Sequence, residues 1–300
     1  MSRAPLYRLT VGAVLLSFAP VLVRLADVGP TPAGFYRMAI GGVLLAGLVV
    51  LRSRSWGRTV GHLLLAALAG VLFSGDLVFW HRSIAFVGPG LATILVNLQV
   101  FVLAAFGIIL LRERASPRLL IAIPLAVVGL FLIFGLEWDL LGSEYHWGVA
   151  FGLLAAVAYA SYLLVLRGAG RRAGDGVEAV ATVATLSLVS AVVLAGLVRL
   201  EGETFAIPSL STFGVLLAYA VLIQVVAWVL ISGALPRVPA SRAGLLLLLQ
   251  PTLAFVWDIL LFARPTSAVE LSGAALTLGA IYLGLTSAGQ QQPPAVSRQA

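Results

Sequence analysis

The amino-acid sequence predicts an all-α membrane protein with ten transmembrane helices, arranged as two inverted five-helix repeats around a central cavity. Three observations lead to this fold class. Hydrophobic residues make up 61% of the 300 residues and charged residues only 10%, and the mean hydropathy is +1.07. Apolar runs long enough to cross a bilayer follow one another along the chain. A weak internal similarity relates the two halves.

A transmembrane helix needs about 20 mainly apolar residues, and charged or Gly/Pro-rich breaks divide the chain into runs of that length. The predicted spans are 6–26, 33–51, 61–84, 90–111, 117–136, 146–167, 177–199, 210–234, 239–262 and 267–287. We therefore expect a single transmembrane domain over residues 1–289, with repeats of about 1–140 and 141–289. The polar, proline-containing end, residues 290–300, is expected to be a disordered tail.

The distribution of arginine predicts the orientation in the membrane. All 19 basic residues are arginines, and basic residues collect on the cytoplasmic side. With a cytoplasmic N-terminus, fourteen arginines lie inside, and the outer set is Arg24, Arg37, Arg82, Arg199 and Arg264. We therefore expect a multi-pass protein of the bacterial inner membrane with both termini in the cytoplasm. The same distribution accounts for the net charge of +7, so no nucleic-acid partner is expected.

The first span resembles a secretory signal peptide, because Arg3 and Arg8 precede its apolar run. The run is about 20 residues long, however, and it contains Pro20 and Arg24, which favours a retained first helix. Cysteine is absent, so the chain has no disulfide and no thiolate metal site. The three histidines are not spaced to share a metal. We expect neither a metal nor a cofactor.

The internal similarity has an offset of 151 residues. It pairs Gln99 with Gln250 and several apolar residues with one another, such as Val87 with Val238. The alternative is an accidental register of leucine and alanine. Because each half has five spans, an odd number, the two halves must insert in opposite orientations. Inverted repeats around a site near the membrane midplane are a recurring transporter design.

Two stretches, residues 81–134 and 232–265, carry a resemblance to a known family. The first contains the pair Glu113-Arg114 after a helix with Gln99, and the second contains Gln250-Pro251 within a helix. The chain resembles the EamA-type carriers of the drug/metabolite transporter superfamily over essentially its whole length. This resemblance implies ten helices, of which 1–4 and 6–9 enclose the cavity, and export of metabolites. Within the family, bacterial exporters of amino acids, including aromatic ones, are the most similar branch.

The chain departs from the family pattern at two places. Val100 stands where a proline is common, and Ala263-Arg264-Pro265 stands where a glutamate is usual. These departures argue against one latch shared by both repeats.

Ionisable side chains inside a membrane span are costly and are therefore candidates for function. Asp76, Trp80 and Ser83 are spaced to share one helix face, which offers a carboxylate, an aromatic wall and a hydroxyl to a solute with an ammonium group. The alternative is an Asp76 that pairs with an outer arginine to hold helices together. The neighbouring His81 could relay a proton or could be a hydrogen-bonded structural residue.

Gln99 and Gln250 are expected near the midplane, where an amide can bind a solute carboxylate or bond a neighbouring helix. Pro251 leaves the carbonyl of Leu247 without its helical donor. We expect Pro20 and Pro251 to act as hinges. The remaining candidates for the cavity wall are aromatic or amide side chains at helical spacing, with core packing as the alternative: Tyr159, Tyr162, Gln224, Trp228 and Trp257.

These features predict a transporter, with an intramembrane enzyme or a receptor subunit as alternatives from other classes. The sequence contains no HExxH or GxSxG motif, and such motifs carry zinc or serine hydrolase chemistry, so we expect no enzymatic activity. Few cations are expected at depth, which favours a neutral or zwitterionic solute. We expect export of amino acids, including hydrophobic and aromatic ones, by alternating access, with another neutral metabolite or drug-like solute as the alternative. Besides this solute and membrane lipid, no partner is expected; the chain is expected to be a monomer, with a homodimer as the alternative.

Overall fold

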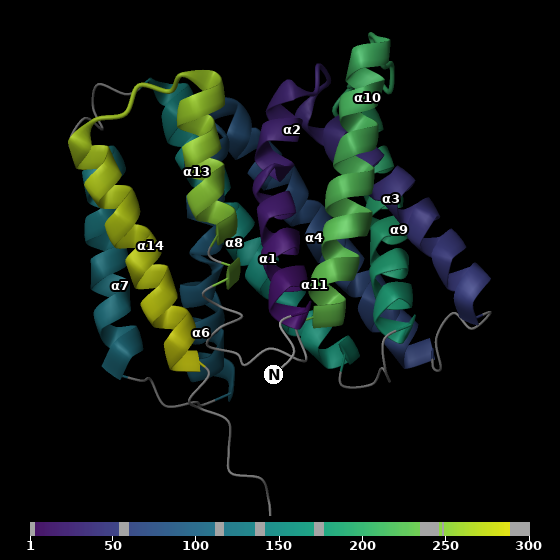
Figure 1. Cartoon of the computed structure of the whole chain (residues 1–300), viewed down its shortest axis with the longest axis horizontal. Helices are drawn as coiled ribbons and strands as arrows, with labels where there is room; N and C mark the ends of the chain where they lie inside the picture. Colours follow the sequence, from purple (N-terminus) through teal and green to yellow (C-terminus); the bar gives the residue numbers. More distant parts are fainter. Residues whose placement is uncertain are drawn as a thin grey trace, which may run out of the picture.

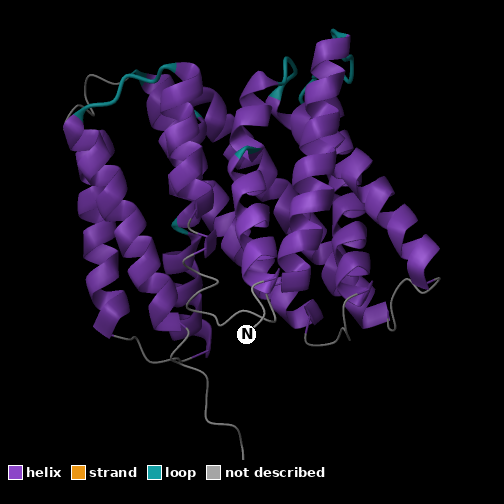
Figure 2. Cartoon of the chain, in the orientation of Figure 1, coloured by secondary structure: helices purple, strands orange, loops and turns teal. Residues whose placement is uncertain are grey.

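The computed structural model describes residues 4–53, 60–111, 117–135, 142–170, 177–234, 246–247 and 249–288. These residues form helices joined by short connections, and no strand occurs among them (Figure 2). The helices stand side by side, so that their ends lie at two opposite faces of the molecule (Figure 1). The predicted tail 290–300 and the pair Glu113-Arg114 lie outside the described residues.

The first half of the chain contains helices at the first five predicted spans. They are α1 (Ala4–Ser17) with α2 (Ala19–Leu25), α3 (Pro30–Ser53), α4 (Val60–Val87), α5 (Pro89–Asn97) with α6 (Gln99–Leu111), and α7 (Pro117–Leu130) continued by the π-helix η1 (Phe131–Gly135).

The second half follows the same plan. Its helices are α8 (Ser143–Gly170), α9 (Val177–Leu200), α10 (Leu210–Ala218) continued by the π-helix η3 (Tyr219–Ala227) and α11 (Trp228–Ala234), α13 (Leu249–Phe262), and α14 (Ala268–Ala288). Of predicted span 239–262, residues 239–245 and 248 lie outside the described part.

Six helical segments in the described part are long and apolar enough to cross a membrane: Ala4–Leu25, Pro30–Arg52, Val60–Val87, Ser143–Leu166, Val180–Leu200 and Leu210–Ile231. Four shorter apolar segments lie at the other predicted spans: Pro89–Leu103, Pro117–Ile133, Leu249–Phe262 and Ala268–Gly284. The helical content of the predicted fold class is therefore confirmed, and the chain has many helices suited to a bilayer.

The helix pairs repeat between the two halves. α3 packs on α9, α5 on α13, and α7 on α14, so equivalent spans of the two halves contact each other. α4 packs on α8, and the equivalent contact joins α11 to α1. Exchanging the two halves therefore reproduces these contacts, as a two-repeat architecture requires.

The first span is interrupted at Phe18, close to the predicted hinge at Pro20. A proline has no backbone N–H, and its ring clashes with the carbonyl four residues earlier, here that of Leu16. The chain tightens before the proline, where the Phe18 N–H bonds the Leu15 carbonyl at 3.0 Å, and α2 then begins at Ala19. The break lies beside the cavity described below, because Leu16 and Ala19 both line it.

The fourth span is interrupted at Leu98, which the sequence did not predict because no proline stands there. The side-chain amide of Asn97 donates to the Thr93 carbonyl at 2.8 Å, and the Thr93 hydroxyl donates to the Pro89 carbonyl at 2.7 Å. Side chains that bond nearby carbonyls compete with the helical ladder and loosen it. The interruption therefore follows from two polar side chains one turn apart.

The paired helices α7 and α14 lie at one side of the molecule (Figure 1). They approach closely at two glycines: a Cβ added to Gly273 would lie 2.7 Å from the Gly129 carbonyl oxygen, and one added to Gly129 would lie 2.8 Å from that of Gly273. Small residues let membrane helices pack backbone against backbone. Neither helix contributes a side chain to the cavity described below, so this pair acts as structural support.

This close approach predicts that Gly273→Ala destabilises the protein. The new methyl group would overlap the backbone of α7, and overpacking of this kind costs about 1–3 kcal/mol. Gly279→Ala is the matched control in the same helix, because nothing lies within 4 Å of a Cβ at that position. Thermal unfolding of the purified variants in detergent would measure the difference. Equal melting temperatures for the two variants would contradict the packing described here.

Candidate functional site

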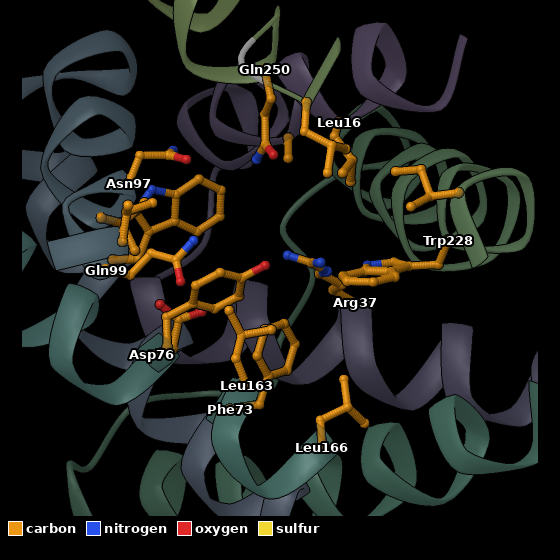
Figure 3. A pocket seen from close by; sticks show the side chains of 17 residues that line it. Leu16, Arg37, Phe73, Asp76, Asn97, Gln99, Leu163, Leu166, Trp228 and Gln250 are labelled. Atoms are coloured by element: carbon orange, nitrogen blue, oxygen red, sulfur yellow. The ribbon is translucent and has the colours of Figure 1, made fainter. Parts of the chain in front are cut away.

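A cavity of about 310 Å³ lies among helices from both halves of the chain (Figure 3). Its walls come from α1 to α6, α8, α11 and α13, together with Leu247. The lining side chains are Leu16, Ala19, Arg37, Phe73, Asp76, Trp80, Val96, Asn97, Gln99, Val100, Tyr159, Leu163, Leu166, Trp228, Ile231, Leu247 and Gln250. The helix interruptions at Phe18 and Leu98 therefore both flank this cavity.

Six of the residues singled out in the sequence line this one cavity: Asp76, Trp80, Gln99, Tyr159, Trp228 and Gln250. Gln99 and Gln250, which the internal repeat pairs, reach it from opposite halves. Gln99 begins α6, and Gln250 lies in the first turn of α13 beside the predicted hinge residue Pro251. The binding roles of these side chains and the movement at either proline stay predictions.

The other five candidates are not among the residues that line this cavity, and the structure places them in contacts between helices. The His81 ring lies between Pro30 and Tyr219, and the Ser83 hydroxyl donates to the Gly148 carbonyl at 2.8 Å. Tyr162 is 2% exposed and packs on Phe73, which itself lines the cavity, with 4.8 Å between ring centroids.

The last two are Gln224 and Trp257. Gln224 is 1% exposed and bonds Arg37 and Ser187, while the Trp257 indole donates to the Ser17 hydroxyl at 3.0 Å. Helical spacing shows which residues share a face, but it does not show which face meets a neighbouring helix.

Two polar lining residues, Arg37 and Asn97, were not among the sequence candidates. Arg37 was predicted as an outer arginine at depth and a possible partner of Asp76, but not as a cavity residue, although it lies within the predicted span 33–51. An arginine at that depth is itself a signal of function, and this signal could have identified it. Asn97 lies two residues from Gln99, and the same argument applies.

Arg37 is 4% exposed and is held by neutral groups. Its Nε donates to the Gln224 side-chain carbonyl at 2.9 Å, and its Nη1 donates to the Tyr219 hydroxyl at 3.0 Å. The guanidinium carbon also lies 5.6 Å from the centre of the Phe73 ring. No ion pair within the described part of the chain includes Arg37. The cavity wall therefore carries a positive charge with no anionic partner there.

Asp76 is 5% exposed, and its Oδ1 has no hydrogen-bond partner among the described residues. None of the ion pairs found there includes Asp76, so a direct pair with arginine, the alternative to a binding role, is not seen among the described residues. Three more cavity residues have buried polar atoms without partners in the described structure: Trp80 Nε1, Gln99 Oε1 and Trp228 Nε1. Unpaired buried polar groups are costly, so these atoms are suited to bind a polar solute.

The comparisons with known proteins agree with this arrangement. The sequence profile of the EamA-like transporter family matches the chain twice, at residues 7–135 and 146–286. The chain belongs to the EamA-like transporter family. The predicted resemblance is therefore confirmed, and the two matches fit the two-repeat packing of the helices. This EamA-family protein is a multi-pass integral membrane protein and a transporter of small solutes.

A relative and a solved structure add to the family match. The chain is 26% identical over 246 residues to "Uncharacterized transporter YetK" of Bacillus subtilis (strain 168), covering 79% of this chain and 71% of that protein. A solved structure described as "Crystal structure of protein" is similar with a TM-score of 0.65 at 17% identity, over 97% of this chain and 100% of that one. The second similarity supports the fold alone.

Bonds between the two halves gather at one end of the helix bundle. The buried carboxylate of Asp258 accepts a bond from the Gly90 N–H at 3.0 Å and lies 3.6 Å from Arg24 and 3.9 Å from Arg264. Arg82 and Glu201 form a second ion pair of 2.7 Å. Figure 1 shows the ends of α2 and α13 and the start of α10 at this face, opposite the marked N-terminus. We call it the ion-paired end.

Glu203 lies in the same region, in the loop that follows α9. Burial raises the pKa of this carboxyl above its ordinary value of 4.5, the nearby Glu201 raises it further, and Arg82 lowers it. A carboxyl with a raised pKa binds its proton more tightly in the folded protein. The penalty for burying Glu203 is therefore absent below pH 4.5 and grows as the pH rises through the raised pKa.

The contacts of Asp258 predict that Asp258→Asn destabilises the protein. The variant keeps the shape of the side chain, but it removes the anion between Arg24 and Arg264. Loss of one partner from a buried pair costs several kcal/mol, and the exposure of Arg24, whose side chain is 43% accessible, reduces this to about 2 kcal/mol. Thermal unfolding monitored by tryptophan fluorescence would measure it. Asp27→Asn, at an exposed position after α2, is the control, and equal stability of the two variants would refute the role of Asp258.

Proposed function

We propose that this EamA-family protein exports zwitterionic small solutes, above all amino acids with hydrophobic or aromatic side chains, from the bacterial cytoplasm. One observation carries the proposal. The guanidinium of Arg37 and the carboxyl group of Asp76 line the same cavity, and neither takes part in an ion pair among the described residues. A zwitterion brings one charge of each sign, so it can neutralise both groups at once.

The groups around the cavity suit the parts of an amino acid. A carboxylate can form short charge-assisted bonds to the guanidinium of Arg37, and an ammonium group can donate to Asp76. Figure 3 shows both side chains reaching into the cavity from separate positions on its wall. An apolar side chain can pack on Phe73, Trp228 and Leu163, which line the same space. Free amino acids with small polar side chains would lose this last contact.

The proposed mechanism is alternating access by the two inverted repeats, residues 1–140 and 141–289, each with five spans. The proposed hinges of this movement are Pro20, near the break in the first span, and Pro251, in the first turn of α13. The cavity is lined in span eight by α11, which lies at the same end as the N-terminus in Figure 1. With both termini in the cytoplasm, the solute enters from that side, and the ion-paired end must open to release it.

The same cavity could accept another solute. Its aromatic and aliphatic lining favours a neutral metabolite or a drug-like compound as the second candidate, which would leave Arg37 and Asp76 without partners. The family match favours transport over an intramembrane enzyme. We also propose that the protein transports as a monomer in contact with lipid, with a homodimer as the alternative.

The amino-acid proposal predicts flux of hydrophobic amino acids through the purified protein. Vesicles reconstituted with the protein would be offered labelled threonine, methionine, phenylalanine and tryptophan, with protein-free vesicles as the control. We expect saturable flux that is faster for phenylalanine, tryptophan and methionine than for threonine. No flux of any of the four would end the amino-acid proposal. Repeating the measurement with the proton gradient collapsed would reveal whether transport is coupled to protons.

Asp76→Asn should reduce flux of phenylalanine at least tenfold while leaving the yield and melting temperature of the protein nearly unchanged. The amide keeps the size of the side chain but loses the charge that binds the ammonium group, and a charge-assisted bond contributes about 1.5–3 kcal/mol. The exposed Asp27→Asn serves as the control and should transport normally. A variant that fails to insert or melts far earlier would instead assign Asp76 a structural role.

A further inference from the structure

The guanidinium of Arg37 lies in a hydrogen-bonded frame that extends away from the cavity. We propose that Gln224, Tyr219 and His81 are positioning residues that hold Arg37 with neutral acceptors, which reserves its charge for a solute carboxylate and makes the site selective for solutes that carry one. This inference rests on the proposed function, because it names the group that Arg37 recognises.

The direction of each hydrogen bond follows from its partners. The Pro30 carbonyl can only accept, and it lies 2.8 Å from His81 Nδ1, so Nδ1 carries the hydrogen. In the neutral ring Nε2 is then an acceptor, and it lies 3.0 Å from the Tyr219 hydroxyl, which donates to it. The hydroxyl oxygen is therefore oriented to accept from Arg37 Nη1 at 3.0 Å. The imidazole of His81 thus orients the Tyr219 hydroxyl, and this hydroxyl in turn orients the guanidinium of Arg37.

Gln224 is oriented in the same manner from the other side. Its Nε2 donates to the Ser187 hydroxyl of α9 at 2.9 Å, which turns its carbonyl oxygen toward Arg37 Nε at 2.9 Å. Both Gln224 and Ser187 are almost completely buried. Because the amide is held at both ends, it acts as an acceptor for Arg37 that carries no charge.

The π-helix η3 places Tyr219 and Gln224 together. The two residues are five apart, and an α-helix of 3.6 residues per turn would separate their directions by about 140°. In a π-helix, hydrogen bonds run from residue i to i+5, so residues five apart lie nearly one above the other. The π-helix η3 begins at Tyr219 and includes Gln224. This rare backbone form, which often marks functional sites, is what directs both acceptors at one arginine.

The frame leaves part of the guanidinium for the solute. An arginine has five N–H donors, and two of them are engaged by Gln224 and Tyr219 among the described residues. Figure 3 shows the guanidinium of Arg37 directed into the cavity. A carboxylate in place of Gln224 would satisfy the same geometry but would neutralise the charge. The choice of a neutral amide there is therefore what makes Arg37 an anion site.

The test uses Gln224→Glu and three probes: phenylalanine, phenylalaninamide, which lacks the carboxylate, and 3-phenylpropanoate, which lacks the ammonium group. The variant places an anion against Arg37 Nε. We expect the KM for phenylalanine to rise at least tenfold and the KM for phenylalaninamide to change less than twofold. 3-Phenylpropanoate should raise the melting temperature of the unmodified protein but not that of the variant. An unchanged preference for phenylalanine over its amide would overturn the inference.

Tyr219→Phe keeps the test decisive if the glutamate variant fails to insert. It removes the hydroxyl that binds Arg37, and the preference for phenylalanine over phenylalaninamide should fall about fivefold, whereas a purely structural role would alter both solutes alike. Tyr282→Phe, on the peripheral helix α14, is the matched control. If the unmodified protein carries no amino acid but is stabilised by 3-phenylpropanoate in a manner that both variants abolish, the proposed function fails and this inference stands. If no probe is carried and none stabilises the protein, both fail.

Discussion

The central constraint in this protein is that a buried arginine cannot lose its charge. In a low-dielectric interior, the guanidinium of Arg37 must be surrounded by hydrogen-bond acceptors. Here the described acceptors are an amide and a phenol, not carboxylates. The backbone that supplies them leaves the α-helical form at η3. The π-helical backbone of the eighth span thus supplies the hydrogen-bond acceptors that Arg37, in the second span, requires.

Three irregular helix segments of this EamA-family protein lie in spans that line the cavity, and one more, the π-helix η1, continues α7. The first span breaks at Phe18, the fourth at Leu98, and the eighth changes to a π-helix. Inside a bilayer, backbone groups released from helical bonds are tolerated only where protein or a wet cavity can satisfy them. The support helices pack differently: α7 and α14 meet through glycines, away from the cavity. The helices that line the cavity are therefore distinct from the α7–α14 pair, which packs closely and supports the structure.

Hydropathy was sufficient to predict the helices, because an apolar run of bilayer length is typical of a transmembrane span. It also drew attention to Asp76 and to Gln99 and Gln250, since polar groups are rare within such runs. It could not separate Trp228, which lines the cavity, from Trp257, which bonds Ser17. Trp228 follows Gln224 by four residues and Trp257 follows Gln250 by seven, and both spacings place the two side chains on one helix face. The difference depends on how each helix is rotated against its neighbours. Arg37 was not predicted to line the cavity, because the sequence analysis treated it as an outer charge and as a possible structural partner of Asp76.

The bonds at the ion-paired end join the first half of the chain to the second through full charges, Arg24 with Asp258 and Arg82 with Glu201. In the proposed alternating-access mechanism, these charges must separate before this face can open. The side chains of Arg24, Arg82 and Glu201 are partly accessible to solvent, and dissolved ions weaken attraction between accessible charges over about 10 Å at 0.1 M salt. Under the proposed alternating access, the barrier to opening would therefore depend on ionic strength at one face of the membrane, and the surroundings on that side would help to set the rate of transport.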